Sequence, residues 1–374
     1  MNFALSDEQE FLKEAARGAL SRFKTVAAAR DALDGGALPD LWPTAIEAGW
    51  PGLLVTEANG GAELTVLEAT LVFEELGRVL ASVPLLGHLP ATLLLDRAGV
   101  SDLAGALAAG AARAAFVPAR PPTDLGDGWS VDPALGMTRA PAPAYAGGRV
   151  TGTAAWVPDA PGAEHLVVVL DDGRAAHVLA ADATVEPATV YDVTRSLGHV
   201  TFAGAPARLL ELGGDDTAAA WYVAQALLAA EAVGAVDVAL AVSVAYAKER
   251  HTFGRAIGSY QAVKHELVEM LRGLDNARSL MYYAGWVAQD QPDEFALAAS
   301  AFRLAAGNAF DHAARAQISV HGGIGATWEH DAPLYFRRAQ LSRRLLGGTA
   351  GAADRVAGEL LTTARQRNAA AAAA

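Results

Sequence analysis

The chain of 374 residues contains no cysteine at all. This absence excludes disulfide bonds, thiolate nucleophiles and cysteine-ligated metal sites. Charged residues make up 19% of the chain, aromatic residues 7%, and the formal net charge is −13. No run of lysine and arginine forms a long basic face, and binding a nucleic acid requires local neutralisation of its phosphates. We therefore expect no nucleic-acid partner.

The first residues also lack the basic segment followed by an apolar segment that is typical of a secretory leader. The most apolar stretch, residues 218–247, is interrupted by Gln225, Glu231 and Asp237. Polar groups at this spacing suit a buried helix of a bundle better than a membrane span. We expect a cytoplasmic protein with no membrane partner.

Several common catalytic motifs are missing too. No GxGxxG follows a strand pattern, and neither a Walker-type phosphate loop nor a GxSxG nucleophile elbow is present. The segment from His265 to Glu269 begins like a zinc-protease helix but lacks the second histidine. We interpret it as a solvated helix face and expect no metal site.

What the chain has in plenty is apolar surface, because 52% of its residues are hydrophobic and many of them are alanine. Alanine has the highest helix propensity, so this composition favours closely packed helices. Ser6 followed by Gln9 predicts the capped start of a first helix. Helical spacing of apolar residues then continues through 41–48 and 64–80, and an alanine-rich helix ends near Ala112.

The pattern changes in the middle of the chain. Residues 116–145 are rich in proline and glycine, and short β-rich runs follow at 149–156, 165–170, 175–179 and 199–202. The last third returns to long helical patterns, at about 217–249, 259–289, 292–320 and 332–365. Long helices joined by short loops favour an antiparallel bundle.

The predicted fold is therefore mainly α with a β domain. We expect a helical N-terminal domain (1–113), a small β-sheet or barrel domain (114–212), a C-terminal four-helix bundle (213–367) and a disordered alanine tail (368–374).

Three motifs in separate thirds of the chain closely resemble the acyl-CoA dehydrogenase family. The first is Arg250-His-Thr-Phe253-Gly254 followed by Gln261, and the second is Gly322-Gly323-Ile-Gly325. The third lies near the N-terminus, where Gly49-Trp50, Gly60-Gly61 and Glu74-Glu75-Leu76-Gly77 stand in the family's order. The resemblance implies an FAD-dependent enzyme that removes hydrogen from the α and β carbons of an acyl-CoA. It also implies a dimer or tetramer and electron-transfer flavoprotein as the acceptor.

The same motifs suit FAD on chemical grounds. The pyrophosphate of FAD calls for a cation with directional donors, which Arg250 offers, and Phe253 can pack against a flat ring. The predicted cofactor-binding residues are Arg250, Thr252, Phe253, Gly254, Gln261, Ser319, Gly322, Gly323, Gly325 and Trp156. Purely structural interpretations also stay open: a helix-terminal ion pair for Arg250, a core position for Phe253 and a tight connection between helices for the glycine loop. In the family these bundle residues mostly reach the FAD held by a neighbouring subunit.

The sequence departs from the family at the catalytic base. The glutamate of many members corresponds here to Gly347, or to Leu346 when the alignment starts from the glycine loop. A second family position, 26 residues before Arg250, holds Ala224. None of these side chains can accept a proton, so we predict no catalytic residue in this chain. Glu231 is the nearest carboxylate, and a buried structural role suits it better than that of a base.

Contacts to the chain's own flavin are also reduced. Trp156 is present, but Pro158 replaces the hydroxyl residue that follows it, and Ser319 replaces a glutamine before the glycine loop. We therefore hypothesise that the chain resembles the smaller, base-lacking subunit of actinobacterial heteromeric acyl-CoA dehydrogenases. The alternative is a scaffold or binding subunit of the same fold without redox activity.

Overall fold

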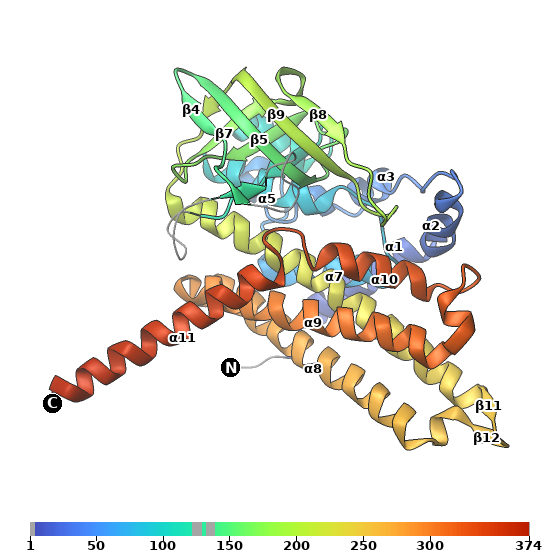
Figure 1. Cartoon of the computed structure of the whole chain (residues 1–374). Coiled ribbons are helices and arrows are strands. Elements are labelled where there is room, and N and C mark those ends of the chain that lie inside the picture. The colour runs from blue at the N-terminus through green and yellow to red at the C-terminus, as the bar shows by residue number, and fades with distance from the viewer. Residues whose placement is uncertain (1–3, 122–128, 132–138, 374) are drawn as a thin grey trace.

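The computed structural model describes residues 4–121, 129–131 and 139–373. Figure 1 shows β-sheets at one end of the molecule, a helical bundle at the other, and the N-terminal helices packed between and beside them. The prediction of a mainly α fold with a β domain and a C-terminal bundle is confirmed.

Six α-helices form the N-terminal part: α1 (Asp7–Ser21), α2 (Thr25–Leu33), α3 (Trp42–Glu47), α4 (Val66–Arg78), α5 (Leu85–Arg97) and α6 (Ser101–Ala108). Short 3-10 turns lie at η1 (Trp50–Gly52) and η2 (Glu57–Asn59). The predicted cap of α1 is confirmed, since Ser6 accepts from the Gln9 backbone N–H and the Gln9 side chain accepts from the Ser6 N–H.

Two four-stranded sheets follow. One has the order β1 (Ala114–Val117), β6 (His165–Val169), β7 (Ala175–Leu179), β10 (Arg208–Leu209), with β1 parallel to β6. The other has the order β4 (Ala144–Ala146), β5 (Arg149–Pro158), β9 (Leu197–Pro206), β8 (Thr184–Pro187) and is antiparallel. A small pair, β2 (Ser130–Val131) and β3 (Arg139–Ala140), lies beside them. The four predicted strand segments are present as β5, β6, β7 and β9.

Strand β1 is buried on both faces because it lies between the β domain and the helices. Ala115 and Val117 belong to the apolar core between the sheets, while Ala114 and Phe116 belong to the core shared with the helices. Residues on alternate faces of one strand therefore join the β domain to α5.

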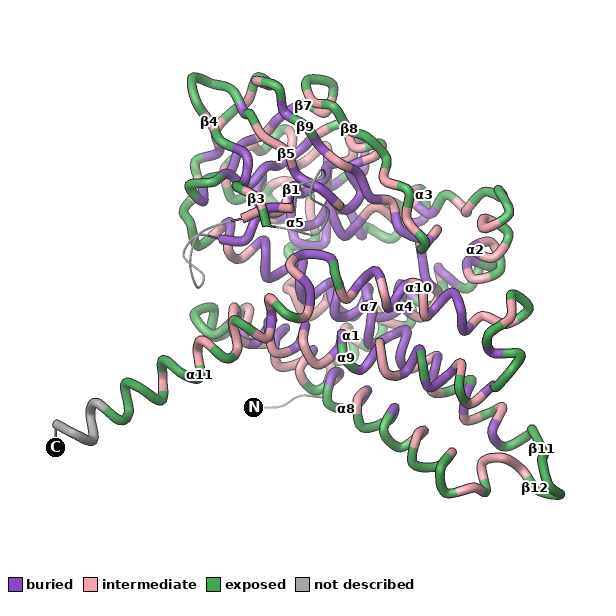
Figure 2. The backbone as a smooth tube through the Cα atoms, viewed as in Figure 1, coloured by how far each residue is buried: buried purple, intermediate pink, exposed green. Residues whose placement is uncertain are grey.

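The C-terminal part contains α7 (Gly214–Glu249), α8 (Gln261–Asp290), α9 (Phe295–His321), α10 (Ala332–Ser342) and α11 (Gly348–Ala373). Among the described residues α7 is the one helix long and apolar enough to cross a membrane, but 67% of its most apolar window is buried. Figure 2 shows this buried path through the molecule. The prediction of a buried bundle helix is confirmed.

Two predictions for the C-terminus need correction. The single helix expected at 332–365 is interrupted, because Leu346, Gly347 and Gly348 all have positive φ (52°, 80° and 70°), which ends α10 and restarts the chain as α11. A disordered tail was expected from residue 368, whereas α11 continues to Ala373, as the high helix propensity of alanine allows. The proposed domain limits remain predictions; β1 begins at Ala114 and α7 at Gly214.

The Glu74-Glu75-Leu76-Gly77 motif has a packing role. A Cβ atom at Gly77 would lie 2.0 Å from the Glu231 carbonyl oxygen of α7, and one at Gly234 would lie 1.8 Å from the Glu74 carbonyl oxygen of α4. Only glycine permits such a close helix crossing. The Glu74 carboxylate binds Lys13 and Arg278, at 2.6 Å and 2.9 Å, and so ties α4 to α1 and α8.

Candidate functional site

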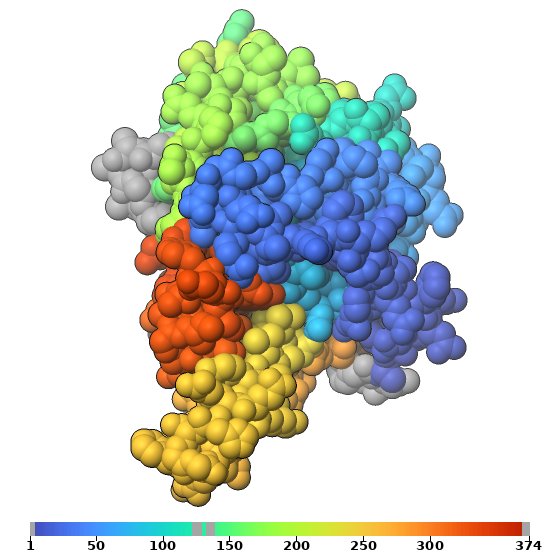
Figure 3. All heavy atoms as spheres, turned by 90° about the vertical axis from the view of Figure 1, so that its right-hand side faces the viewer, coloured from blue at the N-terminus to red at the C-terminus, as the bar shows by residue number. Residues whose placement is uncertain are grey.

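The first family motif forms an exposed hairpin where α7 ends and α8 begins. Strand β11 (His251–Thr252) pairs with β12 (Arg255–Ala256), and the short turn η4 (Ile257–Ser259) leads into α8. The hairpin stands at the far end of the bundle in Figure 1, and Figure 3 shows this region, in gold, projecting beyond the rest of the molecule.

Phe253 and Gly254 form the tip of this hairpin, with φ of 48° and 80°. A two-residue hairpin loop of type I′ requires positive φ at both positions, which suits glycine and strains phenylalanine. The Phe253 side chain is nevertheless 93% exposed, so no intrachain packing offsets the strain. Strained, exposed aromatic residues are typical of binding sites rather than of the core. The core interpretation of Phe253 is therefore excluded.

Three more predicted residues lie on this hairpin or directly beside it. Arg250 is the C-cap residue of α7, and its carbonyl accepts from the Ile257 N–H at 2.8 Å. The Thr252 carbonyl accepts from the Tyr260 hydroxyl at 3.1 Å. Gln261 is the first residue of α8. The side chains of Arg250, Thr252 and Gln261 are all exposed, and the described residues provide no ion pair to Arg250. Its guanidinium is free to bind an anion.

The second motif follows α9 as the turn η6 (Gly322–Ala326). The two motifs lie close together, because the Tyr246 ring near the end of α7 stacks on His321 with 4.4 Å between centroids. Ser319 and Gly322 are exposed, and a Cβ atom at Gly322 or Gly323 would meet no atom within 4 Å. Gly325 differs, since a Cβ atom there would lie 2.7 Å from the Ile318 carbonyl oxygen. The turn thus presents an open backbone surface beside the hairpin.

Trp156 lies elsewhere, on β5. Its ring meets His199 edge-on with 4.7 Å between centroids, and its buried Nε1 has no hydrogen-bond partner in the described part of the chain. Its other neighbours include Leu345 and Leu346. The structure therefore brings nine of the ten predicted residues to one end of the bundle. Trp156 lies instead beside the loop of Leu346 and Gly347, the positions that correspond to the family's catalytic base.

Bulky side chains fill the region around those positions. Trp129 and Trp221 meet edge-on with 6.5 Å between ring centroids, and both border Gly347. The Gln225 amide donates to the Leu346 carbonyl at 2.5 Å and holds the loop against α7. Small cavities of about 10 Å³ and 30 Å³ border Gly347, and another of about 120 Å³ lies beside Trp156 and Leu345. Ligand sites usually measure about 300–1,000 Å³, so each of these cavities among the described residues is too small for a flavin ring and an acyl group.

Glu231 is held by two buried arginines. Its carboxylate accepts from Arg195 Nη1 at 3.1 Å and from Arg338 Nη1 at 3.3 Å, and Arg195 Nη2 makes a further contact. Arg338 also donates to Asp192 at 2.8 Å. Burial is the largest single effect on Arg195 and lowers its pKa, but the charge and hydrogen bond of Glu231, together with the charges of Asp192 and Asp159, raise the pKa overall. Glu231 is therefore a structural carboxylate, as the sequence favoured, and not a base.

Three of these residues could not be identified from the sequence. Arg195, Asp192 and Trp129 lie outside any periodic pattern, so nothing indicates which helix they face. Trp221 could have been identified from the sequence, because it lies one helical turn before Gln225 on α7. The proline- and glycine-rich stretch of residues 116–145 lies partly outside the described residues.

Comparison with known proteins agrees with this geometry. Residues 6–101 match the family model of the acyl-CoA dehydrogenase N-terminal domain, and residues 217–361 match that of the C-terminal domain. Acyl-CoA dehydrogenase IpdE2 of Mycolicibacterium smegmatis is 30% identical over 359 residues, which cover 92% of this chain and 96% of that protein. Acyl-CoA dehydrogenase IpdE2 of Mycobacterium tuberculosis is 33% identical over 343 residues, covering 91% and 93%.

Among solved structures, the ChsE4-ChsE5 complex from Mycobacterium tuberculosis contains a chain with a TM-score of 0.82 and 25% identity, covering 96% of this chain and 99% of that one. This chain belongs to the acyl-CoA dehydrogenase family, FAD-dependent oxidoreductases that act on CH–CH bonds.

Proposed function

We propose that this chain is the non-catalytic subunit of a mixed acyl-CoA dehydrogenase and that its α7–α8 hairpin contacts FAD held mainly by the partner subunit. The observation that carries the proposal is a contrast between two regions. The motif residues are exposed on the hairpin and on η6 except for Gly325, while the region around Gly347 is filled by Trp129 and Trp221. A subunit that donates contacts but holds no substrate of its own would have both properties.

Each hairpin residue has a role that its chemistry suits. The Arg250 guanidinium would bind the FAD pyrophosphate, and the Phe253 ring would pack on a flat part of the cofactor. Gln261 would donate or accept through its amide, and the N–H groups of the Gly322-Gly323 turn would approach the dinucleotide. When bound, FAD supplies the electron-accepting ring, whereas the base would come from the partner. Trp156 lies apart from these residues, on β5, and its contact with a flavin stays a prediction.

Exposed apolar residues support a partner surface around the same helices. Val268 and Leu271, three residues apart on α8, are both exposed, as is Ile324 on η6. Large apolar side chains that stay exposed to water are typical of an interaction surface. We propose that the partner acyl-CoA dehydrogenase subunit covers this face. An acyl-CoA substrate would bind in the partner, electron-transfer flavoprotein would accept the electrons, and the complex would be cytoplasmic.

Coexpression tests the proposal. The chain is produced alone and together with candidate full-length acyl-CoA dehydrogenases, and flavin absorbance and acyl-CoA-dependent dye reduction are measured for each. We expect a colourless chain alone and a yellow, active complex with the correct partner. Stoichiometric FAD and turnover in the chain alone would refute the proposal, and a stable complex that stays colourless would favour the scaffold alternative.

A matched pair of variants locates the contact. Arg250→Lys keeps the charge but removes the fork of donors, so the complex should still assemble while retaining less FAD. Arg272→Lys on α8, where Arg272 is paired with Glu269 at 2.5 Å, should leave FAD retention unchanged. Equal FAD retention in both variants would argue against Arg250 as the pyrophosphate contact.

A further inference from the structure

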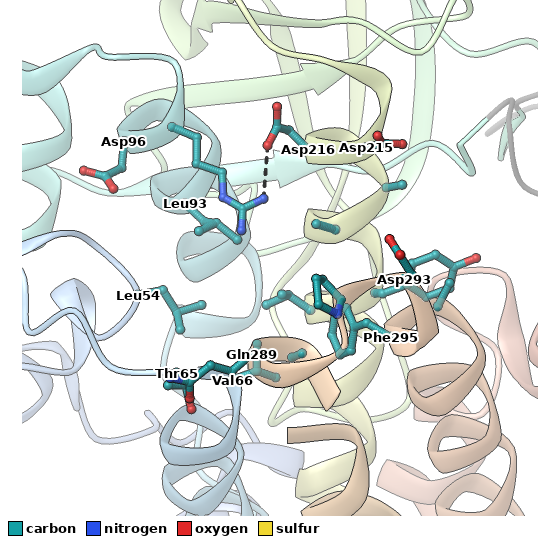
Figure 4. A pocket seen from close by; sticks show the side chains of 18 of the residues that line it. Leu54, Thr65, Val66, Leu93, Asp96, Asp215, Asp216, Gln289, Asp293 and Phe295 are labelled. Atoms are coloured by element: carbon teal, nitrogen blue, oxygen red, sulfur yellow. Dashed lines mark hydrogen bonds and ion pairs between the residues drawn. The ribbon is translucent and has the colours of Figure 1, made fainter. Parts of the chain in front are cut away.

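A cavity of about 710 Å³ lies between α4, α5 and the first turns of α7, and none of the predicted cofactor-binding residues lines it. Charges of both signs line it, and Asp216, labelled in Figure 4, is paired there with Arg97 at 3.1 Å. This cavity therefore indicates no particular ligand. The side chains beside η6 form a more specific arrangement, which centres on His321 and His330.

The loop that contains η6 is closed at its base by two histidine rings. His321 is the last residue of α9, and His330 lies two residues before Ala332, the first residue of α10. Their rings pack together with 4.2 Å between centroids, and the His321 ring also packs on Tyr246 of α7. The two ends of residues 322–329, the segment that carries the glycine turn, are therefore held together and against α7.

The His330 ring also caps α10. Its Nδ1 accepts the backbone N–H of Ala332 at 3.0 Å, one of the N–H groups that have no partner within the helix itself. The Asp331 side chain makes no cap hydrogen bond and is instead paired with Arg30 of α2. The next residue of the helix, Pro333, has no N–H to satisfy. His330 thus joins the start of α10 to the end of α9.

Only a neutral His330 can make this cap, because a ring nitrogen that accepts a hydrogen bond carries no proton. Burial has the largest effect on the ring and lowers the pKa of His330. The charges of His321 on α9 and Arg30 on α2 lower this pKa further, while the charge of the adjacent Asp331 raises it. The helix dipole also disfavours a cation at the N-terminus of α10, so the folded chain favours the neutral ring.

We propose that neutral His330 is the positioning residue of the η6 turn and that its protonation frees the loop from the start of α10. The cation loses the bond to Ala332 and meets the charges of His321 and Arg30, so the contact between the two histidine rings is weakened. The link to the cofactor rests on the proposed function, because a freed turn would no longer hold its N–H groups towards FAD.

The pH dependence of stability tests the cap in the chain alone. The folded-state pKa of His330 lies below the ordinary value of 6.5, so its contribution to the free energy of unfolding is present above about pH 6.5 and is lost as pH falls through the folded-state pKa. His330→Asn supplies an acceptor that does not titrate, since an asparagine side chain accepts from the N–H two residues on. Between pH 8 and pH 5 the melting temperature of the wild type should fall about 2 °C further than that of His330→Asn.

A difference in melting temperature that stays constant with pH would overturn the proposal. His265→Asn, which removes an exposed histidine on α8, is the control for the loss of one imidazole.

Hydrogen–deuterium exchange and FAD retention test the positioning of the turn. The ratio of amide exchange rates at residues 322–330, wild type over His330→Asn, should rise about threefold or more between pH 8 and pH 5.5. In the complex with the partner subunit, the wild type should release more FAD on gel filtration at pH 5.5 than His330→Asn does. A pH-dependent difference in melting temperature without either change would make His330 a structural cap and refute its positioning role. If no partner gives a yellow complex, the proposed function fails, while the exchange ratio still decides whether His330 positions the turn.

Discussion

A Cβ atom added at Gly347 would lie 3.3 Å from Cη2 of Trp129. Cζ2 of Trp221 would lie at 3.4 Å, and Gly347 has a φ of 80°, which side chains rarely adopt. A longer side chain at this position therefore meets two indoles as well as backbone strain. Gly347→Glu should destabilise the chain by about 1–3 kcal/mol and confer no acyl-CoA dehydrogenation. Denaturant unfolding and turnover with an acyl-CoA measure the two effects.

Gly18→Glu provides the control for this substitution. Gly18 is exposed on α1, and a Cβ atom there would meet nothing within 4 Å. Replacing a helix-interior glycine without a clash should stabilise the chain by about 0.5–1 kcal/mol. A Gly347→Glu variant that is as stable as the wild type, or that turns over an acyl-CoA alone, would contradict the filled-site argument.

The sequence predicted the parts of the fold that local periodicity controls. The capping residues of α1 and the length of α7 follow from helix propensity and apolar spacing, and both appear as expected. The break between α10 and α11 depends on positive φ at Leu346, which a leucine does not signal. It requires the tertiary contacts of the loop, such as the bond from Gln225 to the Leu346 carbonyl.

The candidate site divides in the same way. Arg250, Phe253 and Gln261 are close in sequence, so their common hairpin follows from the turn between two helices. The filled region does not, because Trp129 and Trp221 are distant in sequence and meet only through packing of the β domain on α7. The Glu231 network is similarly nonlocal, since Arg195, Glu231 and Arg338 come from three different elements.

Removal of the Glu231 charge should be strongly destabilising. In Glu231→Gln the buried Arg195 loses its counterion, and Arg338 keeps only Asp192. Breaking a buried ion pair on one side costs about 3–5 kcal/mol, so urea unfolding should shift to much lower concentration. Glu269→Gln, which removes an exposed pair with Arg272, should change the free energy of unfolding far less, because water screens an exposed pair. Equal effects of the two substitutions would show that the buried network contributes little.

Asp159 should make stability depend on pH. Burial raises its pKa to about 6, although the Gly87 N–H, which donates to it at 2.8 Å, opposes this. The folded-state pKa of Asp159 exceeds the ordinary value of 3.8. Its contribution to the free energy of unfolding is therefore fully present below about pH 4 and is lost as pH rises through about 6. Asp159→Asn cannot ionise, and asparagine tolerates the positive φ of 60° at this position.

The variant should therefore match the wild type near pH 4 and exceed it by up to about 3 kcal/mol above pH 7, since each pKa unit corresponds to about 1.4 kcal/mol. Melting temperatures of both proteins across pH 4–8 test this. Asp275→Asn, which removes an exposed carboxylate on α8, is the control for the loss of one negative charge. A constant difference for Asp159→Asn as well would mean that Asp159 titrates normally.

Phe253 should show opposite effects on stability and on cofactor retention. Phe253→Asn places Asn-Gly at the tip of the β11–β12 hairpin, the pair that a type I′ turn prefers, and should stabilise the chain by about 1–2 kcal/mol by relieving the positive-φ strain. The same change removes the exposed ring that we propose packs on FAD, so the complex with the partner subunit should lose flavin on gel filtration. Phe11→Ala removes another exposed aromatic ring, on α1 and distant in sequence from the hairpin, and should leave flavin retention unchanged. If Phe253→Asn stabilises the chain and the complex still retains FAD, the ring is not a flavin contact. If the substitution does not raise the free energy of unfolding, the positive φ of Phe253 does not strain the hairpin.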